Sequence, residues 1–88
     1  MRIWKWTLPT LGYDVIEIPH GAKMLTVQMQ HGEPQLWALV DEEMYKDRVQ
    51  IAVYGTGNPI PDNPGEYIGT FQLHNGDLVF HVFVSPNK

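Results

Sequence analysis

Apolar and polar residues alternate along most of this chain with a period of two residues, which is the period of a β-strand. The segment 48–54, RVQIAVY, shows the pattern most clearly, because Val49, Ile51 and Val53 fall on one face. Alternation of this kind indicates a strand with one face buried and the other exposed. The segments that we expect to be strands are 2–8, 15–18, 23–30, 35–40, 48–54, 66–73 and 78–84.

Turn-forming residues separate these segments every eight to twelve residues, a spacing typical of an all-β protein. Asn75-Gly76 is the strongest hairpin signal, because both residues accept a positive φ. Residues 31–34, HGEP, are also short enough to connect a hairpin. Only residues 41–47, DEEMYKD, could form a helix, and with Asp41 as its cap this helix would be a single turn.

We therefore predict one β-rich domain over residues 1–88, an all-β fold. The architecture expected is a compact antiparallel sandwich or small barrel of about seven strands, with little or no helix. The last strand, 78–84, is apolar at nearly every position, and such strands are normally buried on both faces. A single copy of so short a chain covers only one face, so we expect Val79, His81 and Phe83 to meet a second copy in a homo-oligomer.

Composition narrows the possible functions. Six Lys and Arg against ten Asp and Glu give a net charge of -4, and the cations are scattered, which argues against binding to long nucleic acids. No apolar run approaches the length of about 18 residues that a membrane span needs, so a cytoplasmic protein is expected. There is no cysteine, and no pair of residues has metal-ligand spacing, so neither a metal ion nor a cofactor is expected.

Residues 54–70, YGTGNPIPDNPGEYIGT, are the part of the chain richest in glycine and proline. One interpretation is a connection between two strands that its prolines stiffen. The other is a ligand-binding loop, in which Gly55 and Gly57 let the backbone approach a ligand while Thr56 and Asn58 offer hydrogen bonds. The two interpretations are compatible, although the loop lacks the lysine of a P-loop.

Several side chains near or outside this loop are further candidates. Arg48 could hold a phosphate through two hydrogen bonds, or be an exposed charge at a strand end. Trp37 is either buried in a core or interface or offers a flat ring to a ligand. His81 is either a buried structural histidine or a hydrogen-bonding group at a subunit interface. The predicted ligand-binding residues are Trp37, Arg48, Tyr54, Gly55, Thr56, Gly57, Asn58 and His81.

Other residues leave two interpretations open. Trp4 and Trp6 share a face and either pack in the core or form a stacking platform for a base. Glutamine is uncommon in strands unless its amide has partners, yet five glutamines fall in predicted strands. They either face water or form a cluster that reads the edge of a base or a peptide. They are Gln28, Gln30, Gln35, Gln50 and Gln72.

The sequence offers no catalytic constellation. His20, His31 and His74 lie in predicted turns, and Ser85 is the single serine. The acids at 41–43 are expected to form a solvated turn. We therefore predict a protein that is not an enzyme and has no catalytic residue.

Five stretches of the sequence also resemble a known family in order and spacing. They are IWKWTL, IPHGAKMLTVQMQHGEPQLWALVD, GTGNPIP, EYIGTFQL and GDLVFHVF. The family consists of small uncharacterised proteins, encoded mainly by bacteriophages and prophages, and is recognised as a domain of unknown function. Its members often carry histidine after GTG, where this chain has Asn58. The resemblance implies a phage setting and no particular activity.

In that setting, small acidic proteins are often binders or inhibitors of host components. Our preferred hypothesis is a homo-oligomer that sequesters a small nucleotide-like immune signal in the host cytoplasm, with its site between subunits. The alternative is a protein-binding module that inhibits a host protein through a strand edge or an aromatic surface. A small hydrolase is the third hypothesis and the one that the sequence favours least.

Overall fold

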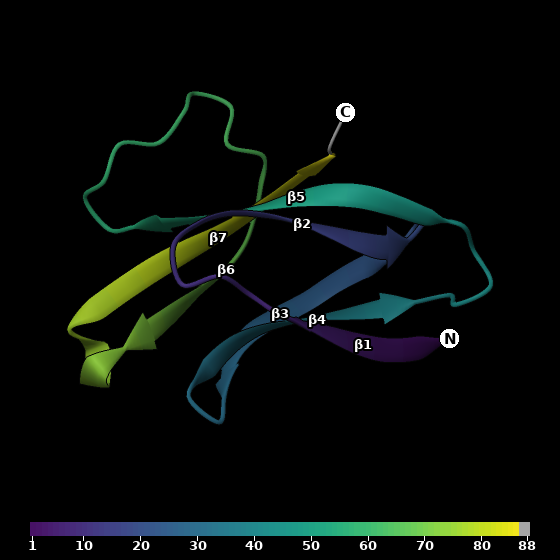
Figure 1. Cartoon of the computed structure of the whole chain (residues 1–88), viewed down its shortest axis with the longest axis horizontal. Coiled ribbons are helices and arrows are strands. Elements are labelled where there is room, and N and C mark those ends of the chain that lie inside the picture. Colours follow the sequence, from purple (N-terminus) through teal and green to yellow (C-terminus); the bar gives the residue numbers. More distant parts are fainter. Residues whose placement is uncertain (87–88) are drawn as a thin grey trace.

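The computed structural model describes residues 1–86 and confirms the all-β prediction (Figure 1). Seven strands form two antiparallel sheets, and the described chain contains no α-helix. A short 3₁₀ turn at His74–Gly76 is the nearest approach to one. The strands are β1 (Arg2–Thr7), β2 (Gly12–Pro19), β3 (Lys23–Gln30), β4 (Glu33–Val40), β5 (Lys46–Gly55), β6 (Glu66–Leu73) and β7 (Leu78–Pro86).

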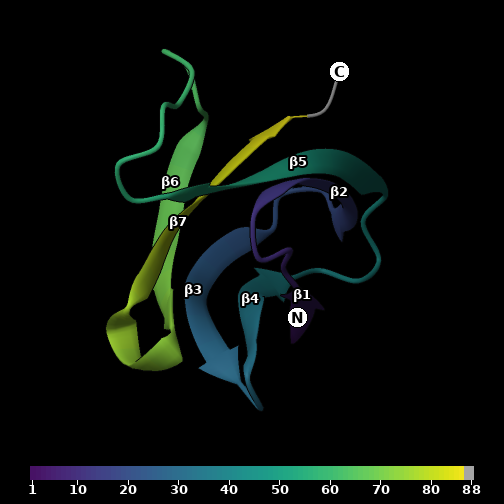
Figure 2. The same cartoon turned by 60° about the vertical axis from the view of Figure 1, so that its left-hand side comes forward.

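The smaller sheet has the strand order β1-β4-β3, and the larger sheet has the order β2-β5-β7-β6. Only the β3–β4 and β6–β7 pairs join strands that are consecutive in the sequence. The edge strands β3 and β6 lie side by side and bring the two sheets together along one border (Figure 2). The two sheets therefore form a sandwich whose layers meet along the border between β3 and β6.

The core fills the space between the inner faces of the two sheets. Leu36 of β4 is fully buried and lies opposite Trp6 of β1 and Val27 of β3, while Ile51 and Val53 face it from β5. Each side chain of this size stabilises the fold by about 1.5–3 kcal/mol when fully buried. The alternation along the strands thus places the apolar residues as the sequence predicts.

Trp4 and Trp6 both belong to this interior. Their side chains are partly buried against the core residues, and their rings meet edge to face with centroids 6.3 Å apart. This geometry supports core packing of the two tryptophans rather than an exposed stacking platform.

Strands β6 and β3 approach closely at Gly69 of β6. A Cβ atom placed there would lie 2.8 Å from the Cβ of Val27 on β3. Real Cβ atoms do not come so close, so only glycine allows this approach of β6 to β3. The register of β6 against β7 also shifts between Tyr67 and Gly69, which turns the strand at the same point.

Both predicted hairpins are present. His31 and Gly32 have φ values of 51° and 79°, the pattern of a two-residue type I′ turn between β3 and β4. Asn75-Gly76 connects β6 to β7, and the positive φ extends back to His74. Each turn reverses the chain between strands that pair directly.

Residues 41–47, the only segment that could have formed a helix, form a turn instead. The Asp41 carboxylate accepts a hydrogen bond from the Glu43 N–H at 3.1 Å, and the Asp41 carbonyl accepts one from the Met44 N–H at 3.1 Å. These two bonds close a tight turn, and β5 begins at Lys46 before a second helical turn could form. Asp41 therefore caps a turn rather than a helix.

Several strands are longer than predicted. Strand β2 begins at Gly12 rather than Val15, because backbone pairing with β5 continues to Val53 whatever the side chains are. Strand β4 begins at Glu33 for the same reason, opposite Gln30 of β3. Side-chain alternation thus locates the middle of each strand better than its ends.

Candidate functional site

The start of the glycine–proline loop is a tight turn at the end of β5. The Asn58 N–H donates a hydrogen bond to the Gly55 carbonyl at 3.1 Å, and Gly57 has a φ of 87°. A positive φ at the third position is the mark of a type II turn and favours glycine. The Thr56 N–H donates to the Val79 carbonyl at 3.0 Å, so the turn is fixed to β7.

Gly55 has a different role from Gly57. A Cβ at Gly55 would lie 2.9 Å from the amide nitrogen of the Asn58 side chain. The missing side chain therefore leaves the space into which Asn58 folds back. The sequence GTGN is explained by this geometry: one glycine makes the turn and the other makes room for Asn58.

A row of four aromatic rings crosses the outer face of the larger sheet beside this turn. Tyr13 of β2 meets Tyr54 of β5 at 6.1 Å between centroids, and Tyr54 meets Phe83 of β7 at 5.8 Å. Phe83 meets Tyr67 of β6 at 5.6 Å. All three contacts are edge to face, the arrangement that aromatic rings prefer. The row therefore holds its rings in fixed orientations.

Strand register explains this row. Phe83 lies opposite Tyr67 on one side and opposite Ala52 on the other, and Ala52 lies opposite Tyr13. Residues opposite one another share a face of the sheet. The small Ala52 side chain is buried beneath the larger rings and leaves space for Tyr54 to touch both neighbours.

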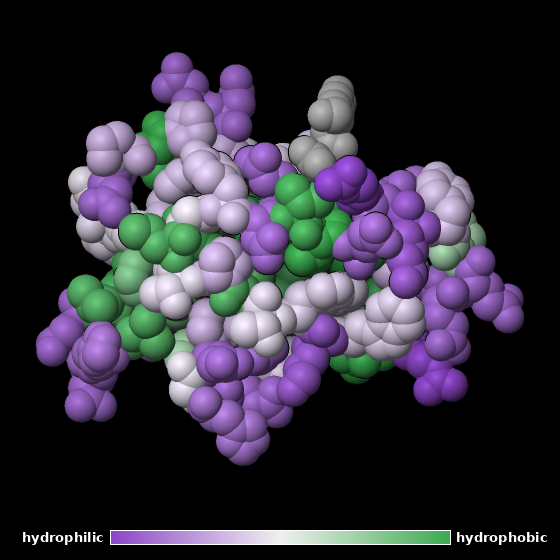
Figure 3. All heavy atoms as spheres, in the orientation of Figure 1, coloured by the Kyte–Doolittle hydropathy of each residue, from purple (hydrophilic) through white to green (hydrophobic). Residues whose placement is uncertain are grey.

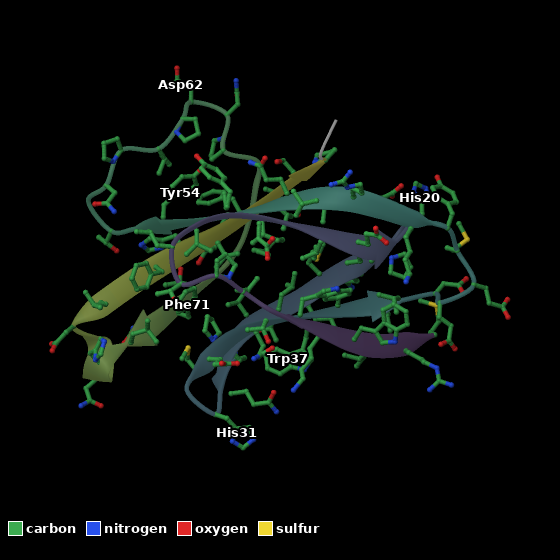
Figure 4. All side chains as sticks on the ribbon, viewed as in Figure 1. His20, His31, Trp37, Tyr54, Asp62 and Phe71 are labelled. Atoms are coloured by element: carbon green, nitrogen blue, oxygen red, sulfur yellow. The ribbon has the colours of Figure 1, made fainter. Side chains whose placement is uncertain are left out.

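The turn and the aromatic row together enclose a pocket of about 250 Å³, which we call the loop pocket. Its walls combine three aromatic rings, Ile60 of the loop, the glycine-rich turn and the His81 imidazole. Figure 4 shows Tyr54 near the end of β5, where the loop begins. The lining residues are Tyr54, Gly55, Thr56, Gly57, Asn58, Ile60, Tyr67, His81 and Phe83.

A chain of hydrogen bonds runs through one wall of the loop pocket. The Tyr67 hydroxyl lies 2.5 Å from the Thr70 hydroxyl, which lies 3.1 Å from Nδ1 of His81. Nε2 of His81 lies 2.6 Å from the Thr56 hydroxyl, which donates to the Val79 carbonyl at 3.3 Å. The imidazole thus links β6 to the turn after β5.

The hydrogen bonds of this network all run in one direction, from the Tyr67 hydroxyl to the Val79 carbonyl. Because the Thr56 hydroxyl donates to Val79, its oxygen accepts a hydrogen bond from His81. His81 then carries its proton on Nε2, and its Nδ1 accepts from Thr70. The Tyr67 hydroxyl donates to Thr70 and keeps its oxygen lone pairs for a ligand. His81 therefore orients two groups that line the loop pocket.

Burial and a neighbouring hydroxyl change the acidity of Tyr54. Desolvation is the larger cause, followed by the hydrogen bond that Tyr54 donates to the Tyr13 hydroxyl at 3.4 Å. Together with the repulsion between the two phenolates, they raise the pKa of Tyr54 to about 12. Tyr54 therefore remains neutral and a hydrogen-bond donor well above physiological pH.

A second hollow of about 410 Å³ lies beside the same turn. It shares Gly55, Thr56 and Asn58 with the loop pocket, and Asp77 adds a carboxylate to it. Its other walls are Leu78, Val79 and Phe80 at the start of β7. Apolar side chains gather over this β6–β7 hairpin end, at the left of Figure 3. The turn after β5 therefore stands between two hollows.

Six of the eight residues predicted to bind a ligand come together in the loop pocket. Arg48 and Trp37 do not. Arg48 lies near the start of β5, six residues or roughly 20 Å along the strand from Tyr54. Trp37 belongs to β4 and lies on the outer face of the smaller sheet (Figure 4). Within one copy of the chain, these two residues therefore do not lie at the loop pocket.

Three lining residues were missed by the sequence analysis: Ile60, Tyr67 and Phe83. Tyr67 and Phe83 reach the pocket because β6 and β7 pair with one another and β7 pairs with β5. Phe83 shares its predicted face with His81, and this was the only available signal. Ile60 stands between two prolines, and nothing in that pattern marks it as a lining residue.

The glutamines divide between the sheets. Gln28, Gln30 and Gln35 lie on the smaller sheet, where β3 and β4 pair. Gln35 is buried and accepts a hydrogen bond from the Thr7 hydroxyl at 3.1 Å, while Gln28 donates to Thr26 at 3.2 Å. Gln30 accepts a hydrogen bond from Lys5. These three amides have hydrogen-bond partners within the smaller sheet, whereas Gln50 and Gln72 lie on β5 and β6 of the larger sheet.

Two further observations concern residues 1–86. No three of their His, Asp or Glu side chains gather closely enough to hold a metal ion. No helix in this part of the chain has the length and apolar character needed to cross a membrane.

The fold and the site define an antiparallel β-protein with a loop-covered aromatic pocket on the outer face of its larger sheet. The sequence matches a domain of unknown function, DUF7352, over residues 1–88, and the chain belongs to this family. The resemblance to a domain of unknown function is thereby confirmed. No curated protein and no solved structure matches the chain.

Proposed function

We propose that this protein binds a small nucleotide-like molecule by its base, in the loop pocket, and sequesters it without converting it. The observation that carries the proposal is the pairing of aromatic rings with hydrogen-bonding groups in one pocket. Tyr54, Tyr67 and Phe83 offer ring surface, and Thr56 and Asn58 offer polar atoms beside it. This combination is typical of sites that hold a flat heteroaromatic ring.

The size of the loop pocket limits what it can hold. Its volume of about 250 Å³ is below the range of about 300–1,000 Å³ that is common for drug-sized ligands. A single base with part of its sugar is the largest fitting portion. Stacking on aromatic side chains contributes roughly 1–3 kcal/mol per base, so one base gives modest affinity.

The proposal includes a homo-oligomer with a second copy over the outer face of the larger sheet. The face is rich in exposed apolar groups: Tyr13 is 62% exposed and Tyr67 is 54% exposed. A second copy there would cover both rings and deepen the loop pocket. The oligomer would raise the affinity that one shallow pocket gives.

The resemblance to proteins of phages and prophages supplies the setting that we propose. In an infected cell, a small binder of this kind would act in the host cytoplasm. Its ligand would be a signal of a bacterial immune system, and sequestration would block that signal. This part of the proposal rests on the resemblance and on the pocket together.

Isothermal titration calorimetry against nucleosides and cyclic and ADP-ribose-type nucleotides tests the proposal. We expect saturable binding to at least one of them, with about tenfold lower affinity in Tyr67→Ala, because one stacking surface is lost. Tyr45→Ala is the matched control: Tyr45 is 63% exposed and lies in the turn before β5, away from the pocket. Flat titrations throughout, or equal losses in both variants, would contradict the proposal.

A specific observation also supports the alternative, a protein-binding module. Leu11, Ile60 and Leu78 are exposed at 56%, 47% and 44%, in addition to the two tyrosines. Exposed apolar side chains that form one continuous patch are typical of a surface that meets a protein, and the alternative requires these side chains to form such a patch. Capture from a host lysate separates the two functions, since the binding of a small molecule predicts no stoichiometric protein partner.

A further inference from the structure

The hydrogen-bond network through His81 determines which groups of the loop pocket a ligand can use. The Thr56 hydroxyl is engaged twice, because it donates to the Val79 carbonyl and accepts from Nε2 of His81. The Tyr54 hydroxyl donates its proton to Tyr13. These two hydroxyls therefore have no free proton to offer a ligand.

Tyr67 presents an acceptor. Its hydroxyl donates to Thr70, and the Thr70 hydroxyl donates to Nδ1 of His81. The Tyr67 side chain lines the loop pocket and the residue is 54% exposed, so its oxygen remains able to accept a hydrogen bond. While His81 is neutral, a ligand N–H group therefore finds a partner in the Tyr67 oxygen.

Protonation of His81 would reverse this arrangement. An imidazolium donates from both ring nitrogens, so Nδ1 would donate to the Thr70 hydroxyl. Thr70 would then donate to the Tyr67 oxygen, and the Tyr67 proton would be released from the network. A ligand N–H group would now face a donor instead of an acceptor.

His81 is the group of the pocket through which pH acts in this range. In the sheet it lies between Tyr54 of β5 and Thr70 of β6, and its neighbours on the same face of β7 are Val79 and Phe83. Among residues 1–86, no acid, lysine, arginine or second histidine lines the loop pocket. The other titratable groups there are phenols, which ordinarily keep their protons below pH 8, whereas an imidazole ordinarily changes charge between pH 5 and 8.

We propose that His81 sets the specificity of the loop pocket: while neutral, it holds the Tyr67 hydroxyl as an acceptor, and the pocket selects bases that carry an amino group. This inference rests on the proposed function and names the ligand class of the same site. Adenine, cytosine and guanine have such a group on the edge of a flat ring. His81 is a positioning residue, because it acts on the ligand through Thr70 and Tyr67.

The test compares nucleosides with analogues that lack the amino group, by calorimetry at pH 8.0 and pH 5.5. The pairs are adenosine with purine riboside, cytidine with pyrimidin-2-one riboside, and guanosine with inosine. At pH 8.0 we expect the best amino nucleoside to bind about fivefold more tightly than its analogue, because the analogue lacks one hydrogen bond. At pH 5.5 this preference should fall towards equality.

Three variants locate the effect. Tyr67→Phe keeps the ring and removes the oxygen, so it should lose the preference at both pH values. Thr70→Val interrupts the connection to Tyr67, and His81→Gln cannot become charged, so in both variants the preference should no longer depend on pH. Thr26→Val is the control, because Thr26 is another half-buried threonine with a hydrogen bond, on β3 of the smaller sheet. It should keep the pH dependence of the parent.

Nitrogen-15 NMR of the free protein examines the network without any ligand. The His81 ring signals are those that disappear in His81→Gln. At pH 8.0 we expect the His81 proton on Nε2, which donates to Thr56, and none on Nδ1.

The outcomes separate the two proposals. A proton on Nδ1 at pH 8.0 overturns this inference whatever the protein binds. Equal binding of amino nucleosides and their analogues at pH 8.0 overturns it and leaves the proposed function standing, as does a pH dependence that persists in Thr70→Val or His81→Gln. Absence of binding by every nucleoside and nucleotide overturns the proposed function and this inference together.

Discussion

At the scale of single residues, Tyr54 shows how position changes chemistry. Its ring contacts Tyr13 and Phe83, its hydroxyl donates to Tyr13, and it forms one wall of the loop pocket. Burial and Tyr13 raise its pKa from the ordinary 10.0 to about 12. The folded chain therefore keeps a proton on Tyr54 over a pH range in which the unfolded chain releases it.

This shift predicts how stability depends on pH. The contribution of neutral Tyr54 is complete below pH 10, and the free energy of unfolding should decrease as the pH rises from 10 towards 12. Urea denaturation at pH 9 and pH 11 measures the decrease, which Tyr54→Phe should reduce and Tyr45→Phe should not. Absorbance titration near 295 nm should lose its highest step in Tyr54→Phe. A step that persists unchanged there contradicts the assignment.

Single residues also show which parts of the loop pocket could be predicted from the sequence. Gly55 to Asn58 were identified by composition alone, because few other segments combine two glycines with two hydrogen-bonding side chains. His81 was identified because a histidine inside an apolar strand is unusual. The direction of its hydrogen bonds could not be predicted, because its partners Thr56 and Thr70 come from two other parts of the chain.

At the scale of strands, alternation predicted faces correctly and neighbours poorly. Val79, His81 and Phe83 do share the outer face of β7, as the pattern indicated. That Tyr67 lies opposite Phe83 depends on the register of β6 and β7, including the shift before Gly69. A shift of one residue moves every side chain to the other face, so register decides which residues form the pocket.

The closest contact between β6 and β3 gives the prediction for this scale. Gly69→Ala should lower the free energy of unfolding by about 1–3 kcal/mol, because the new methyl group would lie 2.8 Å from the buried Val27. Gly55→Ala is a matched control, since its methyl group would meet only the tip of the Asn58 side chain, at 2.9 Å. Urea denaturation measures both variants.

A double-mutant cycle makes this prediction specific. In the Val27→Gly background both the 2.8 Å contact with the Val27 Cβ and the 2.9 Å contact with its Cγ2 are absent, so Gly69→Ala should cost less there than in the parent chain. Equal costs in the two backgrounds would mean that Gly69 is required for its backbone conformation and not for the approach of β3. A cost below that of Gly55→Ala would contradict the close contact itself.

At the scale of the whole molecule, the order of the strands places two residues predicted to bind the ligand away from the loop pocket. Arg48 and Trp37 had the right chemistry for a ligand, but Arg48 lies near the start of β5 and Trp37 lies in the smaller sheet. Most pairings in this fold join strands far apart in the sequence, and local patterns carry no information on such pairings.

The whole molecule also carries the last prediction, which concerns self-association. A standard interface buries about 800 Å² on each partner, roughly a seventh of the 5741 Å² of surface on this chain. We expect the exposed face around Tyr13 and Tyr67 to supply it, and therefore a dimer or larger species in sedimentation velocity at tens of micromolar. Tyr13→Asp should shift the population towards monomer, because a charge would be buried in the interface. Tyr45→Asp, at nearly equal exposure, should not. A parent chain that sediments as a monomer at every concentration would show that this face stays open to solvent, and the loop pocket would then have to bind its ligand within a single copy.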